Sequence, residues 1–270
     1  MDREKVLKLT QRLKDARTKK VVFLSHCILN ENTRYLGGAC RGSCVREIVE
    51  QCLAADIGMV QMPCPEQLAW GGVSKRFLLS AYGAKGMLPF RFRRIFLPLA
   101  IAYTRFVYRQ IAKQTAKQIE DYLDSGYSVI GVVGVDGSPS CGLGKTLDLR
   151  ESFDSILNFE VESLTAAQMN AIVRQSLKDG GGLFTTALKE ELGRRGIDVP
   201  FLAHDLIAEL DGKRSNVSCR GRQPPDCSQV AVSLVRVRLA ACFDPARGVK
   251  KPRHKRAQGG GKGTYSSASP

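Results

Sequence analysis

The stretch Ser128-Val-Ile-Gly-Val-Val-Gly-Val-Asp-Gly-Ser-Pro-Ser-Cys-Gly142 decides the fold of this chain of 270 residues. Its first half is an apolar, largely β-branched run of strand length, which is typical of a strand buried on both faces of a parallel sheet. Its second half is a turn rich in glycine and hydroxyl groups that brings the thiol of Cys141 to the strand end. Ligands of open α/β sheets bind at the carboxyl ends of strands. Cys141 is therefore a candidate functional residue.

Two other predicted strands deliver a cysteine in the same way. Val21–Ser25 is expected to be a strand, and Cys27 follows it closely. Ile57–Pro63 is expected to be another strand, and Cys64 follows it directly. If these strands are neighbours in one sheet, their carboxyl ends bring three thiols to one edge. This convergence is the main functional signal in the sequence.

Helical patterns separate the predicted strands. Apolar positions recur with helical spacing in five segments, over about residues 1–20, 40–56, 105–123, 166–177 and 183–195. A fourth strand is predicted over Val199–Ala203. Strands that alternate with helices through short connections are typical of an α/β protein. We therefore expect a doubly wound, mainly parallel sheet with helices on both faces.

The sequence predicts one domain over residues 1–210 and a basic tail over residues 211–270. Within the domain, a polar loop is expected over residues 145–165, and residues 86–109 mix bulky apolar side chains with arginines. We interpret residues 86–109 as an insertion packed on its own domain. A lid over the site, a dimer surface and a membrane-surface element are the alternatives.

The net charge of +15 belongs mainly to the tail. Residues 213–270 contain thirteen Lys and Arg against Asp226 and Asp244, a balance of +11, which leaves +4 for residues 1–212. Glycine, proline and serine accompany these charges, so the end of the tail is expected to be disordered. We interpret it as a solvated extension, with contact to nucleic-acid phosphates as the alternative.

The nine cysteines are interpreted as the reduced thiols of a cytoplasmic protein. The first twenty residues are charged and lack the apolar core of a signal peptide, and no run is long and uncharged enough to cross a bilayer. In a reducing compartment, clustered thiols favour metal binding or catalysis over disulfides. The sequence leaves the oligomeric state open.

Cys27, Cys64 and Cys141 form an incomplete ligand set, because each stands alone at a strand end. Thiolates suit zinc and iron–sulfur clusters, and structural zinc normally takes four protein ligands. Three thiolates without an evident fourth suggest a cubane cluster with one open iron, which can act as a Lewis acid. A non-catalytic zinc or redox protein is the alternative. The pair His204-Asp205 follows the fourth strand and could reach the same edge.

The order of these motifs resembles the TudS-like family, which includes the 2-thiouracil desulfidases. The resemblance rests on His26-Cys27-Ile-Leu, Cys64-Pro65-Glu66 and Gly137-Ser138-Pro139-Ser140-Cys141-Gly142. It runs over roughly residues 19–205. The resemblance implies a Rossmann-like α/β domain, in agreement with the pattern of strands and helices.

The resemblance also implies an activity, the removal of sulfur from the thiocarbonyl group of a small thiolated compound such as a thiopyrimidine. Cys27, Cys64 and Cys141 would hold a [4Fe–4S] cluster. Glu66 would move protons as a general acid and base, and Ser138 would orient the substrate or a water molecule by hydrogen bonding.

One segment departs from the family pattern. Thr33-Arg34-Tyr35-Leu36-Gly37 stands where the desulfidases usually carry Cys-Arg-Tyr-Asp-Gly, so a cysteine and an aspartate are both missing. The missing residues bear on which substrate the site accepts and not on the three cysteines that would hold the cluster. A further hypothesis is an RNA-directed protein whose basic tail brings the site to thiolated nucleosides.

Overall fold

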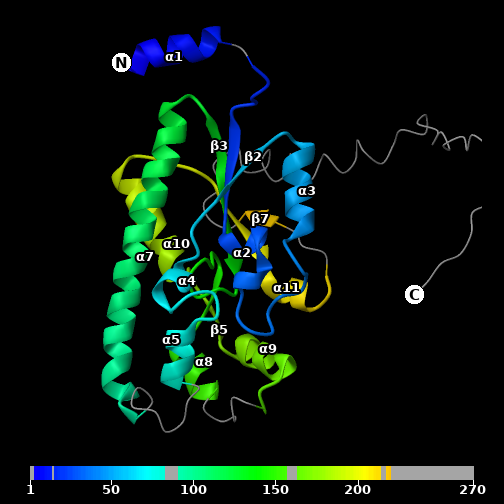
Figure 1. Cartoon of the computed structure of the whole chain (residues 1–270), viewed down its shortest axis with the longest axis vertical. Coiled ribbons are helices and arrows are strands. Elements are labelled where there is room, and N and C mark those ends of the chain that lie inside the picture. The colour runs from blue at the N-terminus through cyan, green and yellow to red at the C-terminus, as the bar shows by residue number, and fades with distance from the viewer. Residues whose placement is uncertain (1–2, 14, 83–90, 157–162, 214–216, 220–270) are drawn as a thin grey trace, which may run out of the picture.

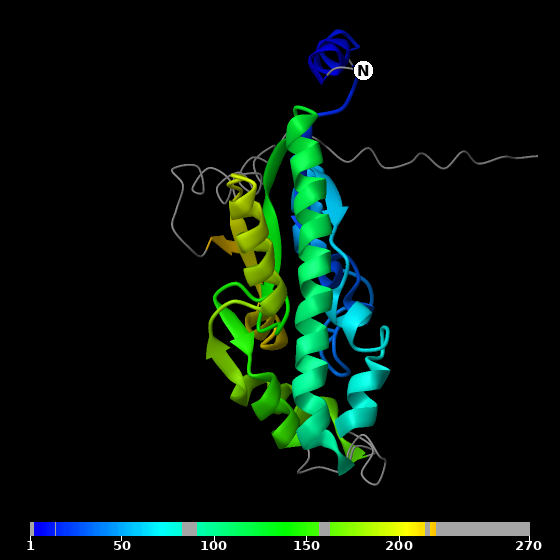
Figure 2. The same ribbon diagram turned by 90° about the vertical axis from the view of Figure 1, so that its left-hand side faces the viewer.

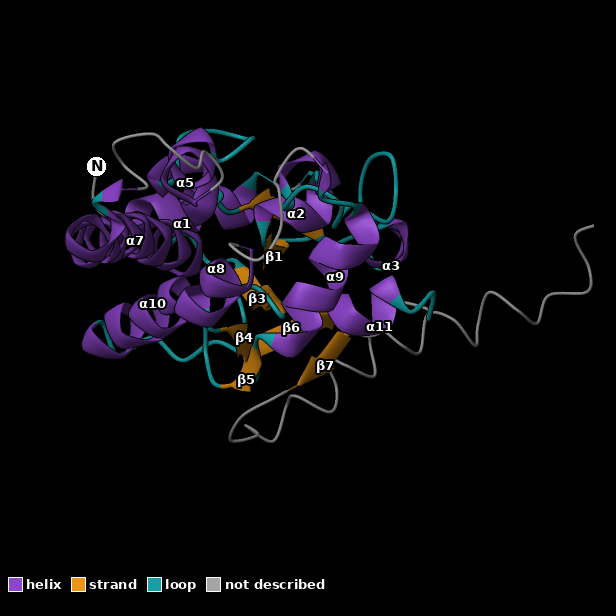
Figure 3. Cartoon of the chain, turned by 90° about the horizontal axis from the view of Figure 1, so that it is seen from below, coloured by secondary structure: helices purple, strands orange, loops and turns teal. Residues whose placement is uncertain are grey.

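A five-stranded sheet forms the centre of the molecule, with helices on both of its faces (Figures 1 and 3). The computed structural model describes residues 3–13, 15–82, 91–156, 163–213 and 217–219. The strands, in spatial order, are β2 (Gly58–Gln61), β1 (Lys20–Leu24), β3 (Ser128–Asp136), β6 (Phe201–Asp205) and β7 (Val217–Cys219). The first four are parallel, and β7 is antiparallel to β6.

Helices connect the strands and cover the sheet. They are α1 (Arg3–Arg12), α2 (His26–Leu29), α3 (Arg46–Ala54), α4 (Pro65–Ala69), α5 (Arg76–Tyr82), α7 (Arg93–Asp124), α8 (Leu149–Ile156), α9 (Ala166–Gln175), α10 (Leu183–Arg194) and α11 (Leu206–Leu210), with a 3-10 helix over Glu31–Thr33. Two short strands, β4 (Lys145–Leu147) and β5 (Leu177–Asp179), form a separate antiparallel pair.

The alternating side chains of β1 divide the core into two layers. Val21 and Phe23 pack with α7 and α10, whereas Val22 and Leu24 pack with α3 and α11. Because successive side chains of a strand point to opposite faces of the sheet, apolar residues at every position require helices on both faces. The α/β fold predicted from the sequence, with a doubly wound and mainly parallel sheet, is confirmed.

The strand order places a topological switch point between β1 and β3. The chain passes from β1 to β2 on one side of the sheet, and then to β3 and β6 on the other. In open α/β sheets, ligands bind in the crevice at the carboxyl ends of the strands beside such a point. The segments that follow β1, β2 and β3 therefore meet where a ligand is expected.

Most of the segment interpreted as an insertion, residues 86–109, is helical in the structure. From Arg93 onward this segment is the first half of α7, a single helix that continues to Asp124 with Pro98 inside it. Thr104, Tyr108 and Ile111 are buried with helical spacing, so the pattern of the second half extends into the first. Residues 86–90 of the predicted insertion lie outside the described residues.

The helix predicted over about residues 40–56 begins only at Arg46. The backbone N–H groups of Cys40 and Arg41 donate to the Glu31 carboxylate at 2.8 and 2.9 Å. Because this carboxylate satisfies the two donors, the chain can remain irregular before α3.

The polar loop predicted over residues 145–165 contains β4 and α8. The prediction missed β4 because its partner, β5, lies far along the chain, at the end of a segment assigned to a helix. The predicted tail also begins within the sheet, since β7 belongs to it; the predicted disorder falls on residues 220–270, which lie outside the described residues. Among the described residues, no helix has the length and apolar character needed to span a membrane.

Candidate active site

The three predicted ligand cysteines line one cavity of about 310 Å³ at the carboxyl edge of the sheet. Cys27 lies in α2, which begins two residues after β1, and Cys64 precedes α4, which follows β2. Cys141 lies in the loop that follows β3. Because β2, β1 and β3 are adjacent and parallel, three thiols distant in sequence reach the same cavity.

The loop that carries Cys141 is fixed by its own polar groups. Ser138 Oγ accepts hydrogen bonds from the backbone N–H groups of Ser140 and Cys141 at 3.2 and 3.1 Å. Asp136 Oδ1, at the end of β3, accepts from three further backbone N–H groups at 2.8, 2.9 and 3.3 Å, those of Leu143, Gly144 and Lys145. Buried polar groups that are satisfied in this way hold one conformation.

Two glycines allow the backbone to approach this loop closely. A Cβ atom on Gly134 would lie 2.2 Å from the carbonyl oxygen of Cys141. A Cβ atom on Gly142 would lie 2.3 Å from the carbonyl oxygen of Lys145. Any larger residue at either position would displace the loop, so these glycines set the position of the Cys141 thiol.

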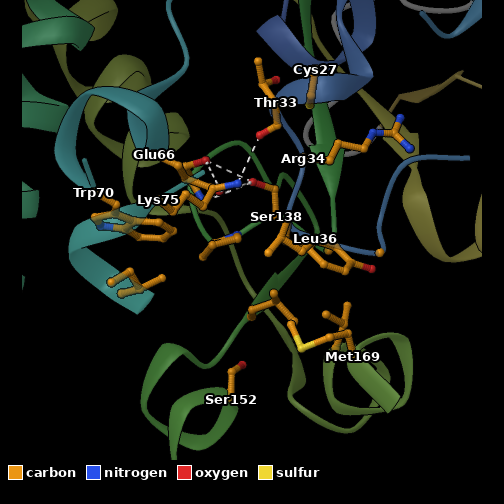
Figure 4. Close-up of a pocket in the computed structure, with 18 of the residues that line it drawn as sticks. Cys27, Thr33, Arg34, Leu36, Glu66, Trp70, Lys75, Ser138, Ser152 and Met169 are labelled. Carbon is orange, nitrogen blue, oxygen red and sulfur yellow. Dashed lines mark hydrogen bonds and ion pairs between the residues drawn. The ribbon is translucent and has the colours of Figure 1, made fainter. Parts of the chain in front are cut away.

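Glu66 joins the cysteine loop to the opposite wall of the cavity (Figure 4). Its Oε1 accepts hydrogen bonds from Ser140 Oγ at 2.9 Å and from Ser138 Oγ at 3.2 Å. Its Oε2 lies 3.2 Å from the ammonium group of Lys75. Glu66 and Ser138, the two residues predicted to be catalytic, are therefore in direct contact, and Ser140 is closer to Glu66 than Ser138 is.

Lys75 is a site residue that the sequence analysis missed. Its side chain is 8% exposed, and its ammonium group also donates to the carbonyl oxygen of Thr33 at 3.0 Å. Its backbone has a φ of 51°, an uncommon conformation for a residue with a side chain. Residues held in such conformations gather at functional sites. The turn at Gly71-Gly72 is visible in the sequence, but nothing local shows that this lysine points inward.

Tyr108 is a second residue that the sequence analysis did not assign to the site. It lies on the inward face of α7 and is 1% exposed. Burial raises the pKa of its hydroxyl well above the usual value, and the charges of Glu66 and of the Cys141 and Cys64 thiols add to this rise. The hydroxyl therefore stays protonated beside the carboxylate and the thiols.

Burial also raises the pKa values of the three cavity thiols. For Cys141 the charge of Cys27 adds to the effect of burial, and for Cys64 burial and then Glu66 raise the pKa to about 12. For Cys27 burial dominates, while the positive charges of Arg34 and Lys75 oppose the rise. These shifts favour the protonated form of the thiols, so binding of a soft metal centre would release their protons.

The segment that departs from the family pattern lies at the cavity. Residues 33–37 all line it, and the Tyr35 hydroxyl donates to Asn170 Oδ1 at 2.7 Å. In Figure 4, Met169 and Ser152 lie at the opposite end from Cys27 and Glu66. Most of the remaining lining is apolar and includes Trp70, Leu78, Leu147, Leu149, Met169, Ile172 and Val173. The cavity thus has a reactive end with thiols and charges and a largely apolar remainder.

A buried ion cluster stands behind the segment after β1. It consists of Glu31, Arg34, Arg41, Glu47, His204 and Glu209. Arg34 Nη1 lies 2.8 Å from Glu209 Oε2 and 3.3 Å from Glu31 Oε2, and Arg41 pairs with the same two carboxylates. Because Arg34 also lines the cavity, the cluster holds one wall of the site.

The pair His204-Asp205 does not act at the cavity edge as the sequence suggested it could. His204 Nε2 lies 2.8 Å from Glu209 Oε2 inside the ion cluster. The Asp205 carboxylate accepts from the backbone N–H groups of Ile207 and Ala208 and caps α11. Neither residue lines the cavity. Their roles in this structure are to complete the ion cluster and to start a helix.

The three thiols are the donor groups of the cavity that could ligate a soft metal centre. In the part of the chain that the structure describes, no group of three or more His, Cys, Asp or Glu side chains could hold a single metal ion as they lie. The three thiols instead line a common cavity from three different strand ends. Of the other described cysteines, Cys40 is exposed, Cys44 is half-buried and Cys52 is buried on the inner face of α3, and none of the three lines the cavity.

Comparisons with known proteins add one distant relative. The chain is 24% identical over 127 residues to an uncharacterized protein of Methanocaldococcus jannaschii, a match that covers 47% of this chain and 70% of the relative. No family model matches the chain, and no solved structure matches it.

Proposed function

We propose that the protein is a [4Fe–4S]-dependent desulfidase that removes sulfur from a small thiolated compound. The observation that carries the proposal is the shared cavity. It brings Cys27, Cys64 and Cys141 together with the contact between Glu66 and Ser138. A purely structural metal site would have no need of a carboxylate and two hydroxyl groups beside its ligands.

The donor set supports the proposed cofactor. Three soft thiolate ligands from three strand ends suit an iron–sulfur cluster, and no fourth described cysteine lines the cavity. When bound, such a cluster would supply an iron without a protein ligand, which can polarise a substrate sulfur as a Lewis acid. The proposal requires reduced thiols and therefore a reducing compartment such as the cytoplasm.

Side chains of the protein would orient the attacking water and transfer its protons. The net reaction converts C=S and H₂O into C=O and H₂S, so it requires proton transfers but no oxidant or reductant. The Glu66 carboxylate would take a proton from the attacking water and return it to the departing sulfur. Ser138 and Ser140, which both hydrogen-bond Glu66 Oε1, would orient the water. Lys75, at Glu66 Oε2, would hold the carboxylate in place.

The shape of the cavity bears on the substrate. The thiocarbonyl group would lie at the end with the thiols and Glu66, and the rest of the molecule would contact the apolar remainder. A thiopyrimidine-like compound has such a polar edge and a flat apolar face. A thiolated nucleoside in RNA is the alternative substrate, because the tail is basic.

The cofactor is tested by anaerobic reconstitution followed by iron, sulfide, zinc and absorption measurements. Wild type should bind about four irons and four sulfides per chain, and Cys141→Ser should lose them. The exposed thiol of Cys40 offers a matched control, since Cys40→Ser should retain the cluster. Stoichiometric zinc without iron would contradict the proposal and favour a non-catalytic metal protein.

The reaction is tested by sulfide release from 2-thiouracil and from a thiolated RNA. Glu66→Gln should lower the rate by about 10²- to 10⁴-fold, the usual contribution of a general acid or base, while the iron content stays unchanged. Glu50→Gln on the exposed surface of α3 is the control and should keep full activity. An unchanged rate in Glu66→Gln would remove the proposed role of the carboxylate.

A further inference from the structure

The outward face of α7 carries an apolar stripe that no other described element covers. Phe92, Ile95, Leu99, Tyr103 and Phe106 are all exposed, from 50% for Tyr103 to 70% for Ile95. Their spacing of three or four residues places them on one side of the helix. Figure 2, in which α7 is the element nearest the viewer, shows that no other described helix or strand lies over the side of α7 that faces away from the sheet.

This stripe is separate from the face of α7 that builds the core. Thr104, Tyr108, Ile111 and Thr115 are buried and project toward the sheet and α10. With 3.6 residues per turn, these positions lie on the opposite side of the helix from Leu99 and the rest of the stripe. Folding therefore does not explain the stripe, and a contiguous exposed apolar patch marks a contact with something outside the fold.

Positive charge surrounds the stripe. Residues 67–119 contain ten Lys and Arg and no Asp or Glu. Five of these cations lie on the exposed surface before or along α7: Arg91, Arg105, Arg109, Lys113 and Lys117. Apolar side chains between cations form a surface that attracts an anionic partner.

We infer that this face of α7 docks on an anionic lipid surface. The apolar stripe enters the boundary between headgroups and acyl chains, and the flanking cations contact the lipid phosphates. A second copy of this chain is a poorer occupant, because packing stripe to stripe would bring like charges together. The tail of this chain is also a poor occupant, because residues 213–270 carry a net charge of +11 and would be repelled by the cations of this face. The inference is independent of the proposed desulfidase activity.

Co-sedimentation of the full chain with vesicles tests the inference. Vesicles of phosphatidylcholine mixed with phosphatidylglycerol should bind wild type, and those of phosphatidylcholine alone should bind it much less. The double variant Ile95→Glu with Leu99→Glu should lower the partition by at least about tenfold. Leu53→Glu is the matched control, because Leu53 is 63% exposed on α3, and it should bind like wild type.

A second measurement separates α7 from the basic tail. In Leu99→Trp, tryptophan emission should shift to the blue on addition of anionic vesicles, whereas Leu53→Trp should show no shift. Equal partition of wild type and the double variant would assign binding to the tail and overturn the inference. Light scattering that shows a dimer in wild type and a monomer in the double variant would assign the face to a second copy, and would also overturn it.

Discussion

The segment after β1 and the loop after β3 each bring a thiol to the same cavity, yet different forces hold them. The loop over Gly137–Gly142 is held by hydrogen bonds to nearby backbone groups and by close contacts at glycines. The segment over Ser25–Gly37 is held by an ion cluster that includes Glu209 of α11, a residue far along the chain. The position of Cys141 thus depends on the small volume of the glycine residues around it, whereas the position of Cys27 depends on the ion pairs behind its segment.

The largest expected effect comes from removing one charge from the ion cluster. Glu209 is 1% exposed and pairs with Arg34, Arg41 and His204. Glu209→Gln would remove the carboxylate oxygen that lies 2.8 Å from the buried guanidinium of Arg34. Losing one partner of a buried ion pair costs about 3–5 kcal/mol of unfolding free energy. Urea unfolding followed by circular dichroism measures this loss.

An exposed ion pair provides the matched control for that measurement. Glu190 lies 3.8 Å from Arg194, and both side chains are more than half exposed. Glu190→Gln should change the unfolding free energy by no more than about 0.5 kcal/mol, because solvent screens such pairs. A similar small change in Glu209→Gln would show that the ion cluster does not hold the segment after β1.

In the loop after β3, a substitution should destabilise the protein through steric crowding rather than through loss of charge. In Gly142→Ala the new Cβ atom would lie 2.3 Å from the carbonyl oxygen of Lys145 and 2.7 Å from that of Ser138. Relieving these contacts should cost about 2–3 kcal/mol and displace Cys141. Iron retention after anaerobic reconstitution should therefore fall together with the urea midpoint.

Another glycine tests whether crowding is the cause. Gly193 lies inside α10, and no atom lies within 4 Å of the Cβ that an alanine would add there. Gly193→Ala should raise the unfolding free energy by about 0.5–1 kcal/mol, because alanine favours the helix. If Gly142→Ala proved equally harmless, the close contacts around Cys141 would not control the loop.

The same contrast explains what the sequence could predict. The turn over Asp136–Gly142 and the strand before it form one continuous signal, so the strand and the turn after it were predicted in place. The inward position of Lys75 and the pairing of β4 with β5 depend on contacts between distant segments, and no local pattern indicates them. The helix predicted over residues 105–123 begins earlier, at Arg93, and its first half was missed because apolar side chains on both faces of α7 obscured its helical period.

The structure confirms the predicted fold but does not test the roles assigned to Glu66, Ser138 and the three cysteines. A mainly parallel sheet could be inferred from alternating strands and helices, but the order of its strands was left open. The chemistry at the strand ends came from the motifs and the resemblance, and the structure adds only their proximity. These roles remain predictions that iron binding and sulfide release will test.

The last expected effect grows with falling pH and concerns the titration of His204 in the ion cluster. Burial, with the charges of Arg34 and Arg41, lowers its pKa from 6.5 to about 3, although Asp205 and Glu47 oppose the shift. The unfolded chain therefore binds one more proton than the folded chain between these two values. Stability is full above pH 6.5 and falls as the pH drops toward 3, by about 1.4 kcal/mol one unit below pH 6.5.

His204→Gln should remove this part of the pH dependence. Glutamine can still donate to Glu209 but does not titrate in this range, so the variant should lose less stability than wild type between pH 6.5 and 5. His26, whose pKa burial also lowers, contributes equally to both proteins. Identical pH profiles from urea unfolding would mean that the pKa of His204 is the same in the folded and unfolded chains, so that the folded chain also protonates His204 beside Glu209 below pH 6.5. In that case a third cation, and not a neutral donor, would balance the carboxylates behind Cys27.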